Sequence, residues 1–126
     1  MNNVKNIEIV YAEDSKSISH LVKSKLILEG YEVHHFENGM GVFEAVLDIK
    51  PAVVILDYNM PVKNGMAVLE ELKKNQDTQN IPVILFTTKQ DQVTVVRCLE
   101  LGVTDYIIKD SLAISNLIPR IKKYIH

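Results

Sequence analysis

Five short apolar segments rich in β-forming residues alternate along this chain with five segments of helical periodicity. The β-type segments cover residues 7–11, 31–36, 52–56, 82–86 and 105–108. Apolar side chains at helical spacing follow each of them, around residues 18–28 and then over residues 39–49, 65–75, 91–101 and 112–125. A strict alternation of strands and helices indicates an α/β domain with a parallel sheet.

Details of the pattern support this fold class. The segment Ala-Val-Val-Ile-Leu at residues 52–56 is apolar without alternation, which is typical of a central strand that is covered on both faces. We expect Gly30 to end the first helix, Asn38 to cap the second and Pro51 to stop it. The connections are short and no repeat interrupts them, so we expect residues 1–126 to form one domain.

Composition excludes several classes of protein. With 47% hydrophobic and 24% charged residues, the chain is a packed globular protein, and its net charge of −2 lacks the excess positive charge of a nucleic-acid binder. A single cysteine, Cys98, permits no internal disulfide. The apolar runs are too short to span a bilayer, and the polar amino terminus shows no signal peptide. We therefore expect a cytoplasmic domain that binds neither nucleic acid nor membrane directly.

Polar side chains follow four of the five predicted strands. Glu13 and Asp14 come after the first, Asp57 after the third, Thr87 after the fourth and Lys109 after the fifth. Because ligands bind at the carboxyl ends of the strands in such sheets, we expect these groups to converge on one edge. Three carboxylates, one hydroxyl and one ammonium group would then share a site.

This set of groups indicates phosphoryl chemistry. Neighbouring carboxylates repel one another unless protons or a cation intervene, and oxygen ligands suit Mg²⁺. A lysine ammonium can balance a phosphoryl group, a threonine hydroxyl can donate a hydrogen bond to it, and an aspartate can accept it as an aspartyl-phosphate. Taken singly, Asp14 or Ser15 could cap a helix and Asp57 could form a turn. The joint arrangement favours one phosphoryl site over a series of unrelated caps and turns.

Four sequence motifs lie at these strand ends. They are Glu13-Asp14, the run from Asp57-Tyr58-Asn59-Met60-Pro61 through Asn64-Gly65, Ile81-Pro82-Val83-Ile84 ahead of Thr87, and Asp105-Tyr106-Ile107-Ile108-Lys109. In this order, the sequence resembles the receiver domain of bacterial two-component response regulators over essentially the whole chain. The resemblance, which includes chemotaxis regulators, implies a flavodoxin-like, doubly wound, five-stranded parallel sheet of order 2-1-3-4-5 with five helices.

The resemblance also implies roles for individual residues. Asp57 would be the phosphoacceptor, Lys109 would pair with the phosphoryl group and Thr87 would hydrogen-bond to it, while Tyr106 would change rotamer together with Thr87. Magnesium would be held by Asp57, directly by Asp14, by Glu13 through a bound water, and by the backbone carbonyl of Asn59.

Partners follow from the same resemblance. A histidine kinase or a phosphotransfer protein would supply the phosphoryl group, and the surface of the fourth helix, fifth strand and fifth helix would change in response. The reader of that surface would be a downstream protein or an output domain of a longer chain. Such a domain is a monomer or a weak, phosphorylation-dependent dimer. It is not an enzyme beyond promoting its own phosphorylation and slow dephosphorylation.

The sequence departs from the family pattern at two positions. Asp110 follows Lys109 where the family usually has a proline that forms a cis peptide bond. Because a cis bond before a non-proline residue costs about 2.5–4 kcal/mol, we expect a trans bond and a differently shaped loop. Thr88 stands where the family favours alanine or glycine, and we expect its bulk to narrow access to Asp57.

Rival functions fit the sequence less well. A dinucleotide-binding enzyme needs a third glycine where Glu44 stands after Gly39-Met40-Gly41, and a flavin carrier needs a phosphate cradle where Glu13 lies. An aspartate-nucleophile phosphatase needs a general acid where Asn59 stands, two residues after the nucleophile. The remaining alternative is a degenerate receiver that acts only as a protein-interaction module.

Overall fold

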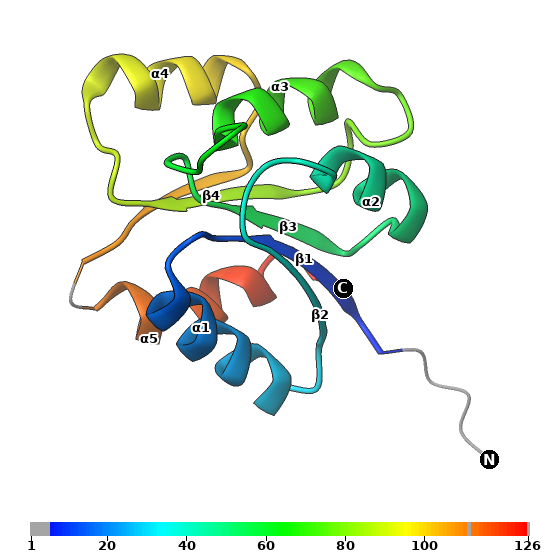
Figure 1. The fold of residues 1–126 in the computed structure, drawn as a ribbon, viewed down its shortest axis with the longest axis vertical. Helices are drawn as coiled ribbons and strands as arrows, with labels where there is room; N and C mark the ends of the chain where they lie inside the picture. Colours follow the sequence, from blue (N-terminus) through cyan, green and yellow to red (C-terminus); the bar gives the residue numbers. More distant parts are fainter. Residues whose placement is uncertain (1–5, 111, 126) are drawn as a thin grey trace.

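The computed structural model describes residues 6–110 and 112–125 and shows a five-stranded sheet between two layers of helices (Figure 1). The strands are β1 (Glu8–Ala12), β2 (Glu32–Phe36), β3 (Val53–Leu56), β4 (Val83–Thr87) and β5 (Asp105–Ile108). The helices are α1 (Lys16–Leu28), α2 (Val42–Ile49), α3 (Gly65–Lys74), α4 (Gln92–Glu100) and α5 (Ala113–Lys122). Strands and helices alternate strictly, as the hydrophobic pattern predicts.

All strand pairs are parallel, and the order in the sheet is β2-β1-β3-β4-β5. The predicted flavodoxin-like order is therefore confirmed. Strand β3 lies at the centre and is fully buried, which explains why its sequence is apolar without alternation. All strands run in one direction, so their carboxyl ends share one edge of the sheet.

Each face of the sheet has its own hydrophobic core. On one face, α1 and α5 pack through Val22, Leu26, Leu117 and Ile121; the other face is covered by α2, α3 and α4 (Figure 1). Cys98 is a fully buried member of the second core, as expected of a small apolar residue. Two packed layers hold the sheet rigidly, and this fixes the positions of the loops at its edge.

The start of α2 differs from the prediction. Asn38 was expected to cap a helix that begins at residue 39, but its Oδ1 accepts a hydrogen bond from the Met40 N–H (2.7 Å) in a turn. The helix begins at Val42, after Gly41 in the left-handed conformation (φ +79°). Gly39 lies against the carbonyl group of Lys63, where a Cβ atom would collide. This long-range contact fixes the turn ahead of the helix, and local sequence cannot show it.

Candidate phosphoacceptor site

The predicted convergence of polar groups is present at the carboxyl edge of the sheet. Glu13, Asp57 and Lys109 each lie one residue beyond the end of β1, β3 and β5, and Thr87 is the last residue of β4. Backbone hydrogen bonds hold these positions: the Asp57 N–H donates to Ala12 O (3.0 Å), and the Lys109 N–H donates to Thr87 O (2.8 Å). The sheet ladder thus extends into the site and sets its geometry.

Lys109 lies between two buried carboxylates. Its Nζ donates to Asp57 Oδ2 at 2.8 Å and also to Glu13 Oε1. The side chains of Lys109, Glu13 and Asp57 are only 10%, 1% and 7% exposed. Because little water reaches these side chains, each charged group depends on its ion-pair partners for stabilisation.

The loop after β3 shapes the surroundings of Asp57. The Asn59 N–H donates to Asp57 Oδ1 (3.1 Å), and the Gly65 N–H donates to Tyr58 O (2.9 Å). Gly65 lies so close to the Asp57 backbone that a Cβ atom there would collide with the Asp57 carbonyl oxygen. Asn64 caps α3 by accepting from the Ala67 N–H (2.9 Å), which anchors the end of the loop.

Three carboxylates form an oxygen-lined cluster. Each of Glu13, Asp14 and Asp57 offers one carboxylate oxygen, and these atoms lie within 4.8 Å of one another. Ser15 caps α1 by accepting from the Ile18 N–H, and its own N–H donates to Glu13 Oε2 (3.2 Å). Asp14 is exposed and Asp57 is buried, so the cluster opens toward solvent on one side. Hard oxygen donors with access to water fit Mg²⁺, which retains several water ligands.

Thr87 and Tyr106 belong to the same face of the sheet. Thr87 is fully buried, and its hydroxyl oxygen accepts from the Lys89 N–H (3.2 Å). Tyr106 is half-buried, and its hydroxyl donates to the Lys89 carbonyl oxygen (2.6 Å). Both side chains therefore bind the loop that leads from β4 to α4.

The two buried carboxyls have opposite pKa shifts. Burial, assisted by the charge of Asp57, raises the pKa of Glu13 to about 7 in spite of Lys109. Burial alone would also raise the pKa of Asp57, but hydrogen bonding to Lys109, Thr87 and Glu13 and the charge of Lys109 together outweigh it and hold this pKa below its ordinary value. Asp57 is consequently the ionised carboxylate of the pair near neutral pH.

The raised pKa of Glu13 predicts a pH-dependent stability. Between the ordinary value of 4.5 and about 7, the folded chain binds more protons at Glu13 than the unfolded chain does. The free energy of unfolding of the metal-free protein should therefore fall by about 2–3 kcal/mol from pH 4.5 to pH 7.5. The lowered pKa of Asp57 affects the free energy of unfolding only at pH values below this range. Urea denaturation in EDTA should show a flatter profile for Glu13→Gln, whereas the exposed control Glu29→Gln should keep the wild-type profile. An unchanged decline in Glu13→Gln would contradict the assignment.

The two departures from the family pattern have structural counterparts. No cis peptide bond occurs within residues 6–110 and 112–125, so the Lys109–Asp110 bond is trans as expected. The exposed Asp110 side chain accepts from the Leu112 N–H (2.9 Å) and is thereby directed to the start of α5. Thr88 is exposed and, with Lys109 and Asp110, lines a cavity of about 240 Å³ between α1 and α5. Its effect on access to Asp57 stays a prediction.

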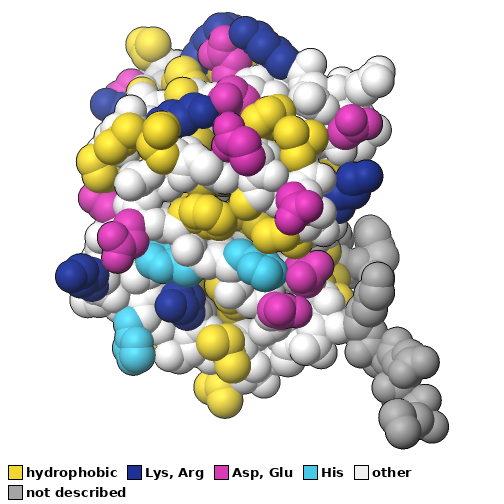
Figure 2. Space-filling model, turned by 45° about the vertical axis from the view of Figure 1, so that its right-hand side comes forward, with side chains coloured by type: hydrophobic (Ala, Val, Ile, Leu, Met, Phe, Trp, Pro, Cys, Tyr) yellow, Lys and Arg dark blue, Asp and Glu magenta, His cyan; other side chains and the backbone are white. Residues whose placement is uncertain are grey.

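The adjacent histidines of β2 lie on opposite faces of the sheet, as their spacing predicts. His34 Nε2 pairs with Glu8 Oε1 (3.2 Å), and Glu32 completes an acidic cluster there. Figure 2, turned toward this edge of the sheet, shows histidine side chains beside acidic ones. His35 Nε2 instead contacts Glu13 O (2.9 Å), so it supports the site. The local sequence does not reveal this contact, because its acceptor is a backbone carbonyl group beyond the end of a different strand.

Comparison with known proteins assigns the family. Residues 9–122 match the family model of the response regulator receiver domain. The signal receiver domain of a signal transduction histidine kinase from Syntrophus aciditrophicus is 36% identical, with a TM-score of 0.78 over 93% of this chain and 88% of that chain. The phosphorylated cyanobacterial phytochrome response regulator RcpA is 27% identical, with a TM-score of 0.80 over 94% and 91% of the two chains. The Mn²⁺-bound form of the response regulator Rcp1 is 28% identical, with a TM-score of 0.74 over 92% and 89%.

The chain belongs to the response regulator receiver domain family, and its acidic pocket with the Lys109 contact is that of a phosphoacceptor receiver. Members of this family are phosphorylated by histidine kinases and are not conventional enzymes. Within the part of the chain that the structure describes, no helix has the length and apolarity needed to cross a membrane.

Proposed function

We propose that this protein is a phosphoacceptor switch of a two-component phosphorelay, in which Asp57 receives a phosphoryl group from a histidine kinase or a phosphotransfer protein. One observation carries the proposal: Asp57 is a buried carboxylate whose pKa is held low while it lies beside both a lysine ammonium and two further acidic groups. A structural ion pair alone would need only Lys109 and one carboxylate.

In the proposed reaction, a carboxylate oxygen of Asp57 attacks the phosphorus atom of a phosphohistidine. A P–O bond forms, the P–N bond breaks, and the imidazole nitrogen leaves with its electron pair and takes up a proton. Lys109 Nζ, already 2.8 Å from Asp57 Oδ2, would balance the charge of the transferred group. Hydrolysis of the aspartyl-phosphate by water restores the carboxylate and ends the signal.

Mg²⁺ fits the proposed site, where Asp57, Asp14, Glu13 through a water, and the backbone carbonyl of Asn59 would hold it. The oxygen cluster supports this assignment, and so does the Mn²⁺ bound in the 28% identical Rcp1. A bound divalent cation supplies positive charge that stabilises the phosphoryl oxygens during transfer. Within the protein, Lys109 and the Asn59 N–H keep the Asp57 carboxylate in a fixed orientation.

The proposed output begins at Thr87. A phosphoryl oxygen would attract the Thr87 hydroxyl away from the Lys89 N–H, and Tyr106 would give up its bond to the Lys89 carbonyl oxygen. Because both bonds fix the same loop, their loss would shift the start of α4. A charge event in the site thus becomes a change of surface shape.

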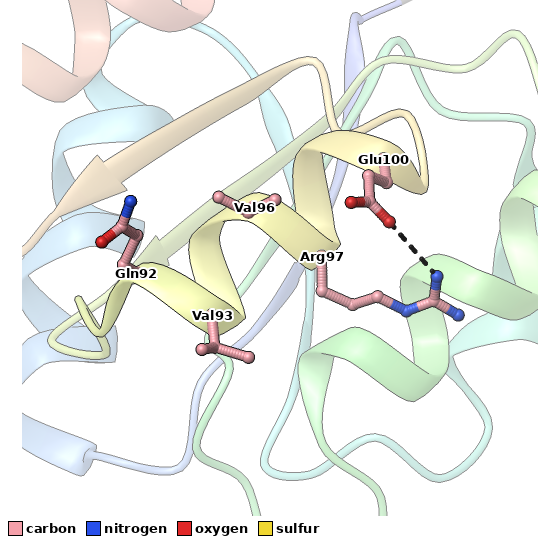
Figure 3. Close-up of a pocket in the computed structure, with 5 residues that line it drawn as sticks. All are labelled: Gln92, Val93, Val96, Arg97 and Glu100. Atoms are coloured by element: carbon pink, nitrogen blue, oxygen red, sulfur yellow. Dashed lines mark ion pairs between the residues drawn. The ribbon is translucent and has the colours of Figure 1, made fainter.

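The surface of α4 suits the binding of a downstream protein. Gln92, Val93, Val96, Arg97 and Glu100 line a hollow of about 400 Å³ on this helix (Figure 3). Val93 and Val96 are exposed, and Arg97 forms an exposed ion pair with Glu100 (3.7 Å). Exposed apolar side chains with a charged rim are typical of a protein-binding surface.

Beryllofluoride with Mg²⁺, a stand-in for the phosphoryl group, tests this function in NMR spectra of the labelled protein. A ligand that binds one of two states more tightly moves the whole domain toward that state. We therefore expect changes in amide chemical shift at residues 92–122 as well as in the site. The variant Asp57→Asn should show neither set of shifts. Changes confined to Glu13, Asp14, Asp57 and Lys109 in the wild type would disprove the coupling between the site and the α4–β5–α5 surface. No change at any residue of the wild type would disprove the phosphoryl site.

A further inference from the structure

The end of β2 holds the backbone of Glu13 from both sides. The Glu13 N–H donates to Phe36 O (2.9 Å), and Glu13 O lies 2.9 Å from His35 Nε2. A carbonyl oxygen can only accept, so His35 Nε2 carries the hydrogen of this bond. Together the two bonds fix the peptide units from which the Glu13 side chain extends.

The packing of His35 keeps its ring in place for this contact. Tyr11 and His35 are direct partners in the β1–β2 register, and their ring centroids lie 5.5 Å apart at an interplanar angle of 42°. Tyr11 is fully buried within the sheet, whereas His35 is half-buried on the edge strand. The buried ring therefore restricts the rotamers of a side chain that would otherwise be mobile at the sheet edge.

The side chain of Glu13 needs such restraint. A glutamate has one more rotatable bond than an aspartate, and ordering it costs correspondingly more conformational entropy. Lys109 Nζ and the Ser15 N–H hold its carboxylate oxygens, but both groups contact only the end of the side chain. The bond from His35 fixes the other end, at the backbone.

We propose that His35 is a positioning residue of the cation site, which acts by donating from Nε2 to the Glu13 carbonyl and so directs the Glu13 carboxylate toward Asp14 and Asp57. His35 does not touch the cation. The inference rests on the proposed function, because it takes Glu13 as part of the Mg²⁺ site. It adds a residue from the edge strand, on the side of the sheet opposite to the Glu8–His34 pair.

The test measures the dissociation constant for Mg²⁺ at pH 8, from the amide shifts of Asp57 and Asn59 during titration. His35→Phe keeps a ring beside Tyr11 but has no donor, whereas His35→Gln places an amide N–H at a similar reach. His34→Phe is the matched control, since it alters the neighbouring residue on the other face. Urea denaturation in EDTA measures the stability of each variant and so shows that it is folded under the conditions of the titration.

We expect His35→Phe to weaken Mg²⁺ binding about tenfold, at the lower end of the range for groups that orient metal ligands. His35→Gln should recover most of the affinity, and His34→Phe should retain it fully. The Glu13 amide signal should move in His35→Phe before any Mg²⁺ is added. Wild-type affinity in His35→Phe, or equal weakening in His35→Gln or His34→Phe, would overturn the inference while leaving the proposed function intact. Absence of Mg²⁺ binding by the wild-type protein would overturn both.

Discussion

Replacing Lys109 with methionine is expected to destabilise the metal-free protein by about 3 kcal/mol at pH 8. The substitution keeps an unbranched side chain of similar length but removes the ammonium group that contacts both Glu13 and Asp57. Breaking a buried ion pair on one side typically costs about 3–5 kcal/mol, because the remaining charge is neither paired nor hydrated. Here two buried carboxylates would lose the same partner.

The loss should depend on pH and on Mg²⁺ in a defined way. At pH 5 Glu13 is protonated, since its pKa is about 7, so only Asp57 loses a counter-charge and the destabilisation is smaller. At pH 8 added Mg²⁺ should restore part of the stability, because it replaces positive charge beside the carboxylates. Urea denaturation of Lys109→Met and the wild type at both pH values, with EDTA or with Mg²⁺, measures these differences.

Lys122→Met provides the matched control. Lys122 also forms an ion pair, with Glu29 (2.7 Å), but these side chains are 52% and 37% exposed. Exposed pairs contribute about 0–1 kcal/mol, so this variant should stay within 1 kcal/mol of the wild type at either pH. If Lys109→Met loses no more stability than Lys122→Met, the two buried carboxylates do not depend on Lys109 for their stabilisation.

Much of the fold follows from the hydrophobic pattern, because the burial of a strand or helix face requires apolar residues at a regular spacing within that one segment. Strand β3 is apolar throughout since both of its faces are buried, and Gly30 ends α1 with the positive φ that a glycine permits. No single segment determines the order of the strands in the sheet, and this order was predicted only from the family resemblance. The predicted start of α2 was wrong. The turn ahead of this helix is fixed by the contact of Gly39 with the Lys63 carbonyl group, which is distant in sequence.

The site, like the fold, combines features that the sequence predicts with features that it does not. The convergence of Glu13, Asp57 and Lys109 could be predicted, because parallel strands bring their carboxyl ends to one edge. The sequence does not show that Lys109 bonds to both carboxylates, since this depends on side-chain rotamers across three strands. It also does not show the contact of His35 with Glu13 or that of Tyr106 with Lys89, because both involve backbone carbonyl groups.

Phosphorylation of Asp57 is expected to be lost completely on substitution by asparagine, because the amide has no carboxylate oxygen to form the acyl phosphate. Glu13 and Asp14 remain in that variant, so the cluster still contains carboxylates that a non-selective donor would modify. Asp110→Asn is a suitable control, since Asp110 is exposed and bonds to the start of α5. It should be phosphorylated like the wild type.

The most direct test is the intact mass of the protein after incubation with acetyl phosphate. With Mg²⁺, the wild type and Asp110→Asn should each gain one phosphoryl group, whereas Asp57→Asn with Mg²⁺ and the wild type in EDTA should gain none. An adduct of equal yield in Asp57→Asn, or no adduct in the wild type with Mg²⁺, would contradict the assignment of Asp57 as the phosphoacceptor.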